Sequence, residues 1–335
     1  MGTFLVDSPQ HGYAAEIPFR MTIEGDSVVY ITNGEEAIQA IDVVISSDSL
    51  FFRMPVFGTI LQAQYLNDTL TGQWINTMKE DYIIPFSAER KEKKMLESDR
   101  SLPRQWKVEF SPGEDPGYGI LYLQMEPDGT ARGTVRTETG DYRFLEGIWD
   151  GQHLCLSAFD GSHVFFLRAT YDGSVLSGGF WSGKHWYEDW IAEPDSDFQL
   201  SDPDSLTFLS GALNFSFPDQ NGDTISLQDP MFSNKVVIVQ VTGSWCPNCM
   251  DETSVLVDMY EAYQPKGLEI VAIDFELKDD FSYFQQRISR LKKDLNVAYP
   301  VLFGGIAKKS EAVKKIPMLN HIMSYPTMIL SLIHI

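Results

Sequence analysis

The sequence predicts two fold classes in one chain: an all-β antiparallel region over roughly the first 195 residues and an α/β region over the remainder. Three observations lead to this prediction. Asp-Gly turns recur among short β-branched and aromatic runs in the first region. An acidic stretch rich in Pro and Ser follows. Continuous apolar runs then alternate with helically periodic segments, which favours a parallel sheet covered by helices.

The composition narrows the possible function classes. The 335 residues suffice for two or three domains, and 43% hydrophobic with 13% aromatic residues is typical of globular chains. The formal net charge of −21 argues against a nucleic-acid partner, because such a protein needs a basic face. No stretch reaches the ~18–20 apolar residues of a membrane span, so no transmembrane segment is predicted. The first residues lack the basic and apolar parts of a signal peptide, which taken literally indicates the cytoplasm.

Asp-Gly dipeptides punctuate the β region. This dipeptide supplies the positive φ angles of tight hairpin turns, and its spacing here suits a meander of short antiparallel strands, closed as a barrel or stacked as a sandwich. The dipeptides are Asp128-Gly129, Asp150-Gly151, Asp160-Gly161 and Asp172-Gly173.

The β region also predicts two similar halves, residues 1–100 and 101–195. Residues 60–74 align with residues 166–180, and four aligned positions are identical at one constant offset: Ala63/Ala169, Tyr65/Tyr171, Leu70/Leu176 and Gly72/Gly178. Such self-similarity indicates a repeated β-meander unit, although alternating strands can also resemble each other by chance. A duplication concerns architecture and not chemistry.

The acidic stretch predicts a linker over residues 196–210, followed by a second domain over residues 211–335. Two continuous apolar runs, Lys235–Val241 and Leu268–Phe275, are typical of strands buried on both faces. Each is followed by a helical pattern. The first runs from Pro247 to Tyr263, and the second carries its apolar stripe on Phe281, Phe284, Ile288, Leu291 and Leu295.

A Cys-x-x-Cys pair lies between the first buried strand and its helix. The chain has three cysteines, and this low, odd count excludes a disulfide scaffold. A cysteine at a helix N-terminus is surrounded by unpaired N–H groups that stabilise a thiolate. We therefore predict that Cys246 attacks and that Cys249, one turn later, resolves a mixed disulfide. Trp245 is expected to wall the site, and Pro247 suits the first helical position.

Three alternatives compete with this interpretation. A zinc knuckle needs two further ligands, and the sequence offers neither a second cysteine pair nor a paired His motif, so no metal site is predicted. A buried structural cysteine pair is a second alternative. A peroxiredoxin is the third: that chemistry uses a Thr three residues before the cysteine and a nearby Arg. Here Thr242 is four residues before Cys246, and no Arg is close in sequence.

The segment Trp245-Cys-Pro-Asn-Cys249 resembles the TlpA/ResA-type thiol–disulfide oxidoreductases of the thioredoxin superfamily, over roughly residues 208–330. Phe215–Leu227 is similar to the hairpin that precedes the core in that family. Glu252 matches its acidic residue three positions after the second cysteine, which implies proton handling for the resolving thiol. An ordinary carboxylate favoured by the helix dipole is the alternative. Ordinary thioredoxins bury an Asp where this chain has Gln240.

The resemblance extends to a proline loop near the end of the chain. Tyr325-Pro326-Thr327 matches the cis-proline loop of the superfamily, which packs against the cysteine pair and offers backbone groups to a substrate. The segment Phe303–Ile322 is interpreted as a helical insertion before this loop, with its lysines on a solvated face. These lysines are Lys308, Lys309, Lys314 and Lys315.

The resemblance implies an enzyme that reduces or exchanges protein disulfides, of the longer Bacteroidota-type form with an N-terminal β region. It implies no cofactor beyond the redox-active Cys246–Cys249 disulfide. It further implies disulfide-containing protein substrates, a membrane thiol carrier as electron donor, an antioxidant role, and a periplasmic or membrane-anchored extracytoplasmic location. A rival hypothesis makes the β region a binding module, with an exposed cluster of Trp181, Trp186 and Trp190. Cys155 is expected to be a packed strand residue.

Both ends of the sequence carry expectations of their own. An extracytoplasmic location without a visible signal predicts an incomplete N-terminus. The thioredoxin fold continues after the strand that begins at Thr327, but the chain ends at Ile335. The hexapeptide Leu330–Ile335 equals one reading frame of a widely used sequencing adaptor. We therefore expect residues 330–335 not to be native and the second domain to be a fragment.

Overall fold

The structure is a computed structural model, and its contacts divide the chain into two units, Met1–Leu200 and Ser201–Ile335. Two expectations fall partly outside the described residues: positions 203–206 of the expected linker and positions 332–335 of the tail. The residues that the structure describes are 1–8, 13–90, 102–113, 116–202 and 207–331.

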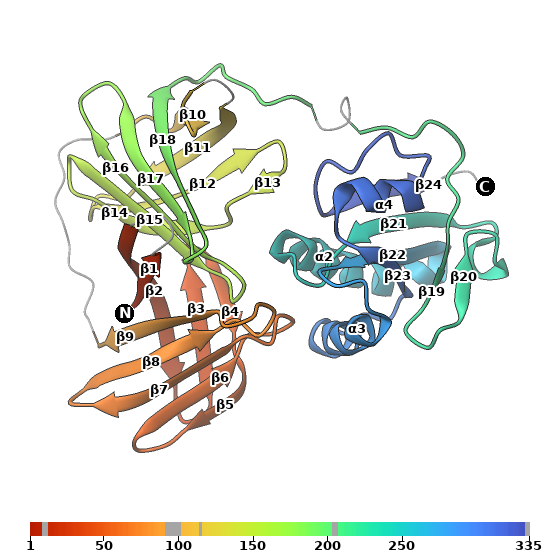
Figure 1. Cartoon of the computed structure of the whole chain (residues 1–335), viewed down its shortest axis with the longest axis horizontal. Helices are drawn as coiled ribbons and strands as arrows, with labels where there is room; N and C mark the ends of the chain where they lie inside the picture. Colours follow the sequence, from red (N-terminus) through yellow and green to blue (C-terminus); the bar gives the residue numbers. More distant parts are fainter. Residues whose placement is uncertain (9–12, 91–101, 114–115, 203–206, 332–335) are drawn as a thin grey trace. The chain divides into compact units, whose positions relative to one another are not determined.

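The first half of the β unit is one antiparallel sheet that follows the chain (Figure 1). Its strand order is β4-β3-β2-β1-β9-β8-β7-β6-β5, so the first strand pairs with the last. The strands are β1 (Gly2–Ser8), β2 (Tyr13–Glu24), β3 (Val28–Asn33), β4 (Glu36–Gln39), β5 (Ile41–Ile45), β6 (Ser49–Arg53), β7 (Ile60–Leu66), β8 (Thr69–Ile75) and β9 (Ile83–Glu89).

The second half closes into a ring. β11 pairs with both β10 and β12, and β10 pairs with β18, so the up-and-down meander returns to its start. The all-β antiparallel prediction is confirmed, and this half forms a barrel. Its strands are β10 (Gln105–Phe110), β11 (Gly117–Met125), β12 (Thr130–Thr137), β13 (Gly140–Asp141), β14 (Leu145–Trp149), β15 (His153–Phe159), β16 (Val164–Tyr171), β17 (Leu176–Ser182) and β18 (Trp186–Pro194).

The four predicted Asp-Gly turns join consecutive strands of this barrel. Their glycines have φ of 78°, 96°, 90° and 106°, which is the left-handed region that a side chain disfavours. Each Asp side chain also accepts a backbone N–H two residues later, at 2.7–3.0 Å. The dipeptide thus supplies both the backbone angle and the hydrogen bond that fix each turn.

The residues that suggested a repeat occupy the same register in both halves. Ala63 pairs with Gly72 across β7 and β8, and Ala169 pairs with Gly178 across β16 and β17. A Cβ at either glycine would overlap the carbonyl oxygen of the neighbouring strand. Both halves therefore need glycine here for the same steric reason.

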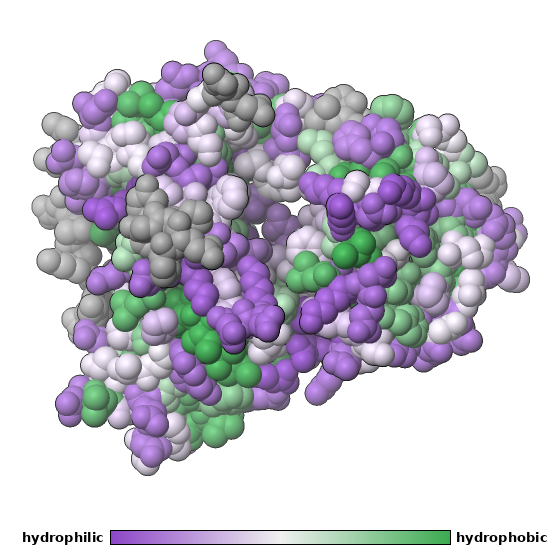
Figure 2. All heavy atoms as spheres, viewed as in Figure 1, coloured by the Kyte–Doolittle hydropathy of each residue, from purple (hydrophilic) through white to green (hydrophobic). Residues whose placement is uncertain are grey.

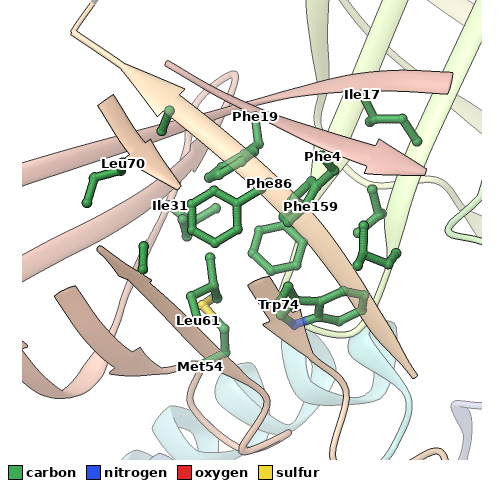
Figure 3. Packing of buried hydrophobic residues seen from close by; sticks show 14 of the residues in the cluster. Phe4, Ile17, Phe19, Ile31, Met54, Leu61, Leu70, Trp74, Phe86 and Phe159 are labelled. Atoms are coloured by element: carbon green, nitrogen blue, oxygen red, sulfur yellow. The ribbon is translucent and has the colours of Figure 1, made fainter. Parts of the chain in front are cut away.

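An aromatic cluster joins the two halves of the β unit (Figure 3). Phe4 stacks on Phe19 with ring centroids 4.3 Å apart, and Phe159 approaches Phe4 at 4.9 Å and Trp74 at 5.4 Å. Phe159 belongs to β15 of the second half, so its sheet contributes to the core of the first. The barrel interior is filled by a separate apolar cluster that includes Trp106, Trp149 and Trp190.

The C-terminal unit is α/β, as predicted. Its sheet has the order β23-β22-β21-β24, with β21, β22 and β23 parallel and β24 antiparallel to β21. Both predicted helices and the hairpin before the core are present. The elements are β19 (Ser216–Pro218), β20 (Thr224–Ser226), the 3₁₀ helix η1 (Pro230–Phe232), β21 (Val236–Thr242), α2 (Pro247–Tyr263), η2 (Gln264–Lys266), β22 (Leu268–Glu276), α3 (Phe281–Leu295), β23 (Val301–Ile306), α4 (Lys309–Lys315) and β24 (Thr327–Ser331).

The helical insertion expected over Phe303–Ile322 is largely wrong. Phe303 to Ile306 belongs to β23, because the run beginning at Val301 pairs with β22 and is mostly buried. The helix that follows, α4, is only seven residues long. Its lysines are exposed, as predicted.

The surface agrees with the acidic composition. Figure 2 shows hydrophilic side chains spread over much of the visible face of both units. Within the described residues, no helix has both the length and the apolar character needed to cross a membrane.

Candidate active site

The Cys246–Cys249 pair forms a disulfide at the N-terminus of α2. Cys246 is the N-cap residue, with extended backbone angles, and its Sγ accepts a hydrogen bond of 3.2 Å from the Cys249 N–H. Pro247 is the first helical residue, where its missing N–H costs no intrahelical bond. The first turn of the helix therefore directs the Cys249 N–H, which has no partner within the helix, at the Cys246 sulfur, and this favours its thiolate.

The two cysteines differ in exposure. Cys246 is 5% exposed, whereas Cys249 is 0% exposed. The predicted order, in which Cys246 meets the substrate and Cys249 acts from within, fits this difference.

The proline loop lies against the disulfide. The peptide bond between Tyr325 and Pro326 is cis, and the Tyr325 carbonyl oxygen lies 3.4 Å from the Cys246 Sγ. Thr327 begins β24, pairs with Val241, and donates its Oγ1 hydroxyl to the Ser324 carbonyl at 2.8 Å. The antiparallel pairing of β24 with β21 brings together segments that lie far apart in the sequence.

Trp245 closes one side of the site. Its indole N–H donates to the Phe275 carbonyl at 2.9 Å, and its ring meets the Tyr325 ring edge-on at 5.6 Å. Trp245 remains half-buried. An indole held at both its polar and apolar parts gives the site a fixed wall.

Glu252 is half-buried one turn after Cys249. Burial raises the pKa of its carboxyl, and a hydrogen bond of 2.9 Å from the Gln240 amide partly opposes this rise. Gln240 also approaches the Thr253 hydroxyl at 3.1 Å and the Cys249 carbonyl at 3.5 Å. Glu252 and Gln240, which occupies the place of the Asp in ordinary thioredoxins, thus contact each other next to the resolving Cys249.

A buried polar cluster that was not predicted from the sequence lies beside the loop that precedes Cys246. Ser244, Asp274, Glu276 and Arg287 are each 5% exposed or less. The Ser244 hydroxyl donates to the Glu276 Oε1 at 2.5 Å, while Arg287 donates to the Ser244 Oγ at 2.9 Å and to its carbonyl at 2.8 Å.

The Asp274 carboxyl of this cluster is affected by its neighbours. Burial raises the pKa of Asp274 well above its ordinary value, and the neighbouring Glu276 raises it further. Arg287 and the Ser244 N–H lower it by smaller amounts. A signal existed in the sequence: Asp274 and Glu276 lie two residues apart at the end of a mostly apolar strand, and every residue of β22 is buried.

Two further predictions from the sequence concern a metal site, which was not expected, and an exposed cluster of tryptophans, which was. The described part of the chain contains no group of three or more His, Cys, Asp or Glu residues arranged to hold a metal ion. The expected exposed tryptophan cluster is wrong: Trp181 and Trp190 are 8% and 1% exposed and belong to different cores. Only Trp186 of the three is exposed: Trp190 is covered in the barrel core, and Trp181 packs in the cluster that joins the two halves. Cys155 is a packed strand residue, as predicted.

Comparisons with known proteins agree with this site. Residues 210–330 match the AhpC/TSA family. The thiol–disulfide oxidoreductase ResA of Bacillus thuringiensis subsp. konkukian is 31% identical over 103 residues, which cover 31% of this chain and 53% of that protein. ResA of Bacillus subtilis strain 168 is 34% identical over 71 residues, covering 21% and 38%. The chain thus spans about half the length, or less, of the curated relatives it matches.

A solved structure from Bacteroides fragilis, described as a thiol-disulfide oxidoreductase, aligns with 37% of this chain and 82% of its own, at 20% identity and a TM-score of 0.30. The family match falls on the unit that holds the Cys246–Cys249 disulfide. The C-terminal unit of this chain carries a thioredoxin-like domain of the AhpC/TSA type, similar to the ResA thiol–disulfide oxidoreductases.

Proposed function

We propose that this protein is a thiol–disulfide oxidoreductase that reduces or exchanges disulfides of protein substrates. One observation carries the proposal: a disulfide at a helix N-terminus lies against a cis-proline loop, with the more exposed sulfur facing that loop. A helix N-terminus stabilises the thiolate that forms when this disulfide is reduced.

The exchange proceeds in two balanced steps. In the reduced protein, the Cys246 thiolate attacks one sulfur of the substrate disulfide, forms a mixed disulfide and releases the other substrate sulfur as a thiolate. Cys249 then loses its proton and attacks the Cys246 Sγ, which restores the Cys246–Cys249 disulfide and releases the second substrate thiolate. Two electrons pass to the substrate, and an external dithiol returns them by the reverse steps.

Glu252 receives the Cys249 proton in this scheme. Because the pKa of the Glu252 carboxyl is raised, it lies closer to the pKa of a thiol, which suits proton transfer between the two groups. We expect Glu252→Gln to slow the second step about tenfold or more, since a positioned acid or base contributes about 10²–10⁴-fold. Rapid-quench trapping of the mixed disulfide measures this step. An unchanged resolution rate would assign Glu252 to the helix dipole alone.

The walls of the site present the substrate. Tyr325 and Pro326 place backbone groups beside the Cys246 sulfur, where an extended substrate chain can pair with them, and Thr327 anchors the start of β24. Trp245 supplies an apolar face for the substrate, while Pro247 fixes the start of the helix. The resemblance to TlpA/ResA-type proteins further supports a membrane thiol carrier as electron donor, a periplasmic or membrane-anchored extracytoplasmic location, and an antioxidant role.

Cysteine variants test the proposal. Cys246→Ser should abolish reduction of a model disulfide such as insulin, because the attacking thiolate is gone. Cys249→Ser should accumulate a mixed disulfide, because the resolving thiol is gone. Cys155→Ser is the matched control, since Cys155 lies in the other unit, and should retain full turnover. Unchanged turnover in Cys246→Ser would sink the proposal.

A peroxidase is the second candidate, and a specific observation favours it. Residues 210–330 match the AhpC/TSA family, and Arg287, absent from the sequence neighbourhood of Cys246, contacts Ser244 two residues before it. Against this candidate, the Arg287 guanidinium donates to the two Ser244 oxygens. For this reason we expect the reduced protein to consume peroxide far more slowly than it reduces disulfides. Faster peroxide consumption, lost in Cys246→Ser, would reverse this ranking.

A further inference from the structure

The buried acid pair Asp274–Glu276 has no role in the exchange steps above. Both side chains are 0% exposed and occupy same-face positions at the end of β22. Three of their four carboxylate oxygens, both of Asp274 and the Oε2 of Glu276, have no hydrogen-bond donor of regular geometry among the described residues, although the Ser244 N–H lies close enough to lower the pKa of Asp274 by a small amount. Buried carboxylate oxygens without donors are strongly disfavoured, so the pair requires an explanation.

A single proton resolves the problem. Two carboxylates side by side in a buried site cannot both ionise at low cost, and one protonated carboxyl can donate to the other. Such a bond would join Asp274 to the Glu276 oxygen that lacks a donor. It would also balance the charge, because the cluster contains two carboxyls and the Arg287 guanidinium: with one proton on the pair, its net charge is zero.

The groups that face Asp274 come from three elements. Glu276 lies on the same strand, Arg287 and Tyr283 lie on α3, and Tyr325 lies on the proline loop. Burial raises the pKa of both tyrosines, so their phenols stay neutral near neutral pH. The charges that act on Asp274 are therefore those of Glu276 and Arg287.

This cluster is linked to two segments that flank Cys246, the loop that precedes it and the proline loop. Ser244, two residues before Cys246, is held by Glu276 and Arg287. Tyr325, whose ring is influenced by the Asp274 charge, places its carbonyl 3.4 Å from the Cys246 Sγ. A change of charge on the pair therefore reaches the surroundings of the attacking sulfur through the field at Tyr325 and through the hydrogen bond between Ser244 and Glu276.

We propose that Asp274 and Glu276 hold one proton between them and act as positioning residues for Cys246, binding that proton more tightly when Cys246 is a thiolate than when it is in the disulfide. The inference rests on the proposed function for its redox partner. When a dithiol reduces the Cys246–Cys249 disulfide, the dithiol gives up two protons. Cys249 takes one of them. At a pH at which the acid pair of the oxidised protein has lost its proton, the pair takes the other. Where the pair already holds its proton, the second is released to solvent.

The proton itself can be observed in the unmodified protein. Titration of ¹³C-carboxyl-labelled protein by NMR, in the oxidised and the reduced forms, should show one protonated buried carboxyl at neutral pH. The signal should titrate at higher pH in the reduced form, and Asp274→Asn should remove it. Two ionised carboxyls at neutral pH, or the same midpoint in both forms, would overturn the proposal whether or not the enzyme turns over substrate.

The pH dependence of the disulfide equilibrium is the second readout. Between the oxidised and reduced midpoints of the pair, the equilibrium constant for reduction by a reference dithiol should change by an additional factor of about ten per pH unit, since one more proton is taken up. Asp274→Asn should lose this extra dependence, while the exposed control Asp279→Asn should keep it. An identical profile in wild type and Asp274→Asn would reduce the pair to a packing role.

The two proposals fail separately. A protein without disulfide reductase activity that still shows the redox-dependent carboxyl titration would refute the proposed function and leave the acid pair intact. An active enzyme without that titration would do the reverse.

Discussion

Two fully buried aspartates, one in each unit, show how differently the two parts of this chain treat charge. Asp160, in a turn of the β unit, receives backbone N–H groups from Ser162 and His163 and lies near Arg143. Burial alone would raise the pKa of Asp160, but His163, Arg143 and these hydrogen bonds lower it overall. Asp274, beside the disulfide, meets another carboxyl, and its pKa is raised.

The difference separates structure from chemistry. The β unit surrounds the Asp160 carboxylate with N–H donors and the Arg143 guanidinium, which also pairs with Glu36, so the charge fixes a turn and joins the two halves. The C-terminal unit instead places two buried carboxyls side by side, so that burial and Glu276 raise the pKa of Asp274 by more than Arg287 and the Ser244 N–H lower it. The buried charge of Asp160 thus stabilises the fold, whereas Asp274 is available for the proposed proton coupling.

The prediction with the largest expected effect asks whether the β unit can be destabilised without changing the C-terminal unit. Trp74→Ala removes a fully buried aromatic from the cluster shared by both halves and should lower the free energy of unfolding of the β unit by about 3–5 kcal/mol. Urea unfolding followed by circular dichroism measures this loss. The Cys246–Cys249 exchange rate in the folded protein should stay at the wild-type value. A parallel loss of exchange would contradict the division into two units.

The next effect concerns the paired aspartate. Asp160→Asn should lower the free energy of unfolding at pH 7 by about 2 kcal/mol, since hydrogen bonds to charged groups are worth about 1.5–3 kcal/mol. The folded-state pKa of Asp160 lies below its unfolded value, so its contribution is present above about pH 3.9 and is lost as the pH falls through the depressed value. Unfolding free energies measured from pH 7 down to pH 2 should therefore converge for wild type and variant. Equal stability at pH 7 would show that the pairing is not stabilising.

The smallest effect has the opposite sign. The folded-state pKa of Asp274 lies above its unfolded value, so the stability linked to this group is present below about pH 3.9 and is lost as the pH rises through the raised value. Asp274→Asn has no proton to lose, and its amide can donate to Glu276. We expect the variant to be more stable than wild type at pH 8, by about 1–2 kcal/mol, because one pKa unit corresponds to about 1.4 kcal/mol. If Asp274→Asn were less stable than wild type at pH 8, Asp274 would be a structural carboxylate like Asp160.

Local patterns were sufficient to predict much of the fold. The Asp-Gly turns, the helices starting at Pro247 and Phe281, and the buried strands all follow from rules that act within a few residues. The cysteine pair was also predictable, because its chemistry depends on a local helix start. Tyr325 and Pro326 required a resemblance, since only the pairing of β24 with β21 brings them to Cys246.

What the sequence did not reveal depends on contacts between distant segments. Arg287 reaches Ser244 from another helix, and no spacing rule relates the two positions. The failed tryptophan cluster has a similar cause: Trp181 and Trp190 lie on adjacent strands but turn toward different cores. The β23 strand was mistaken for a helical insertion because its pairing with β22 outweighs the local pattern.

Each half of the β unit begins and ends on neighbouring strands. Gly2 pairs with Ala88 in the first half, and Trp106 pairs with Pro194 in the second. A module whose first and last strands are neighbours can be duplicated in tandem without breaking any of its own strand pairings, because its two ends lie close together. The same property permits circular permutation: the barrel could be reopened at the exposed Asp172-Gly173 turn and its old ends joined by a short link, with every ladder preserved.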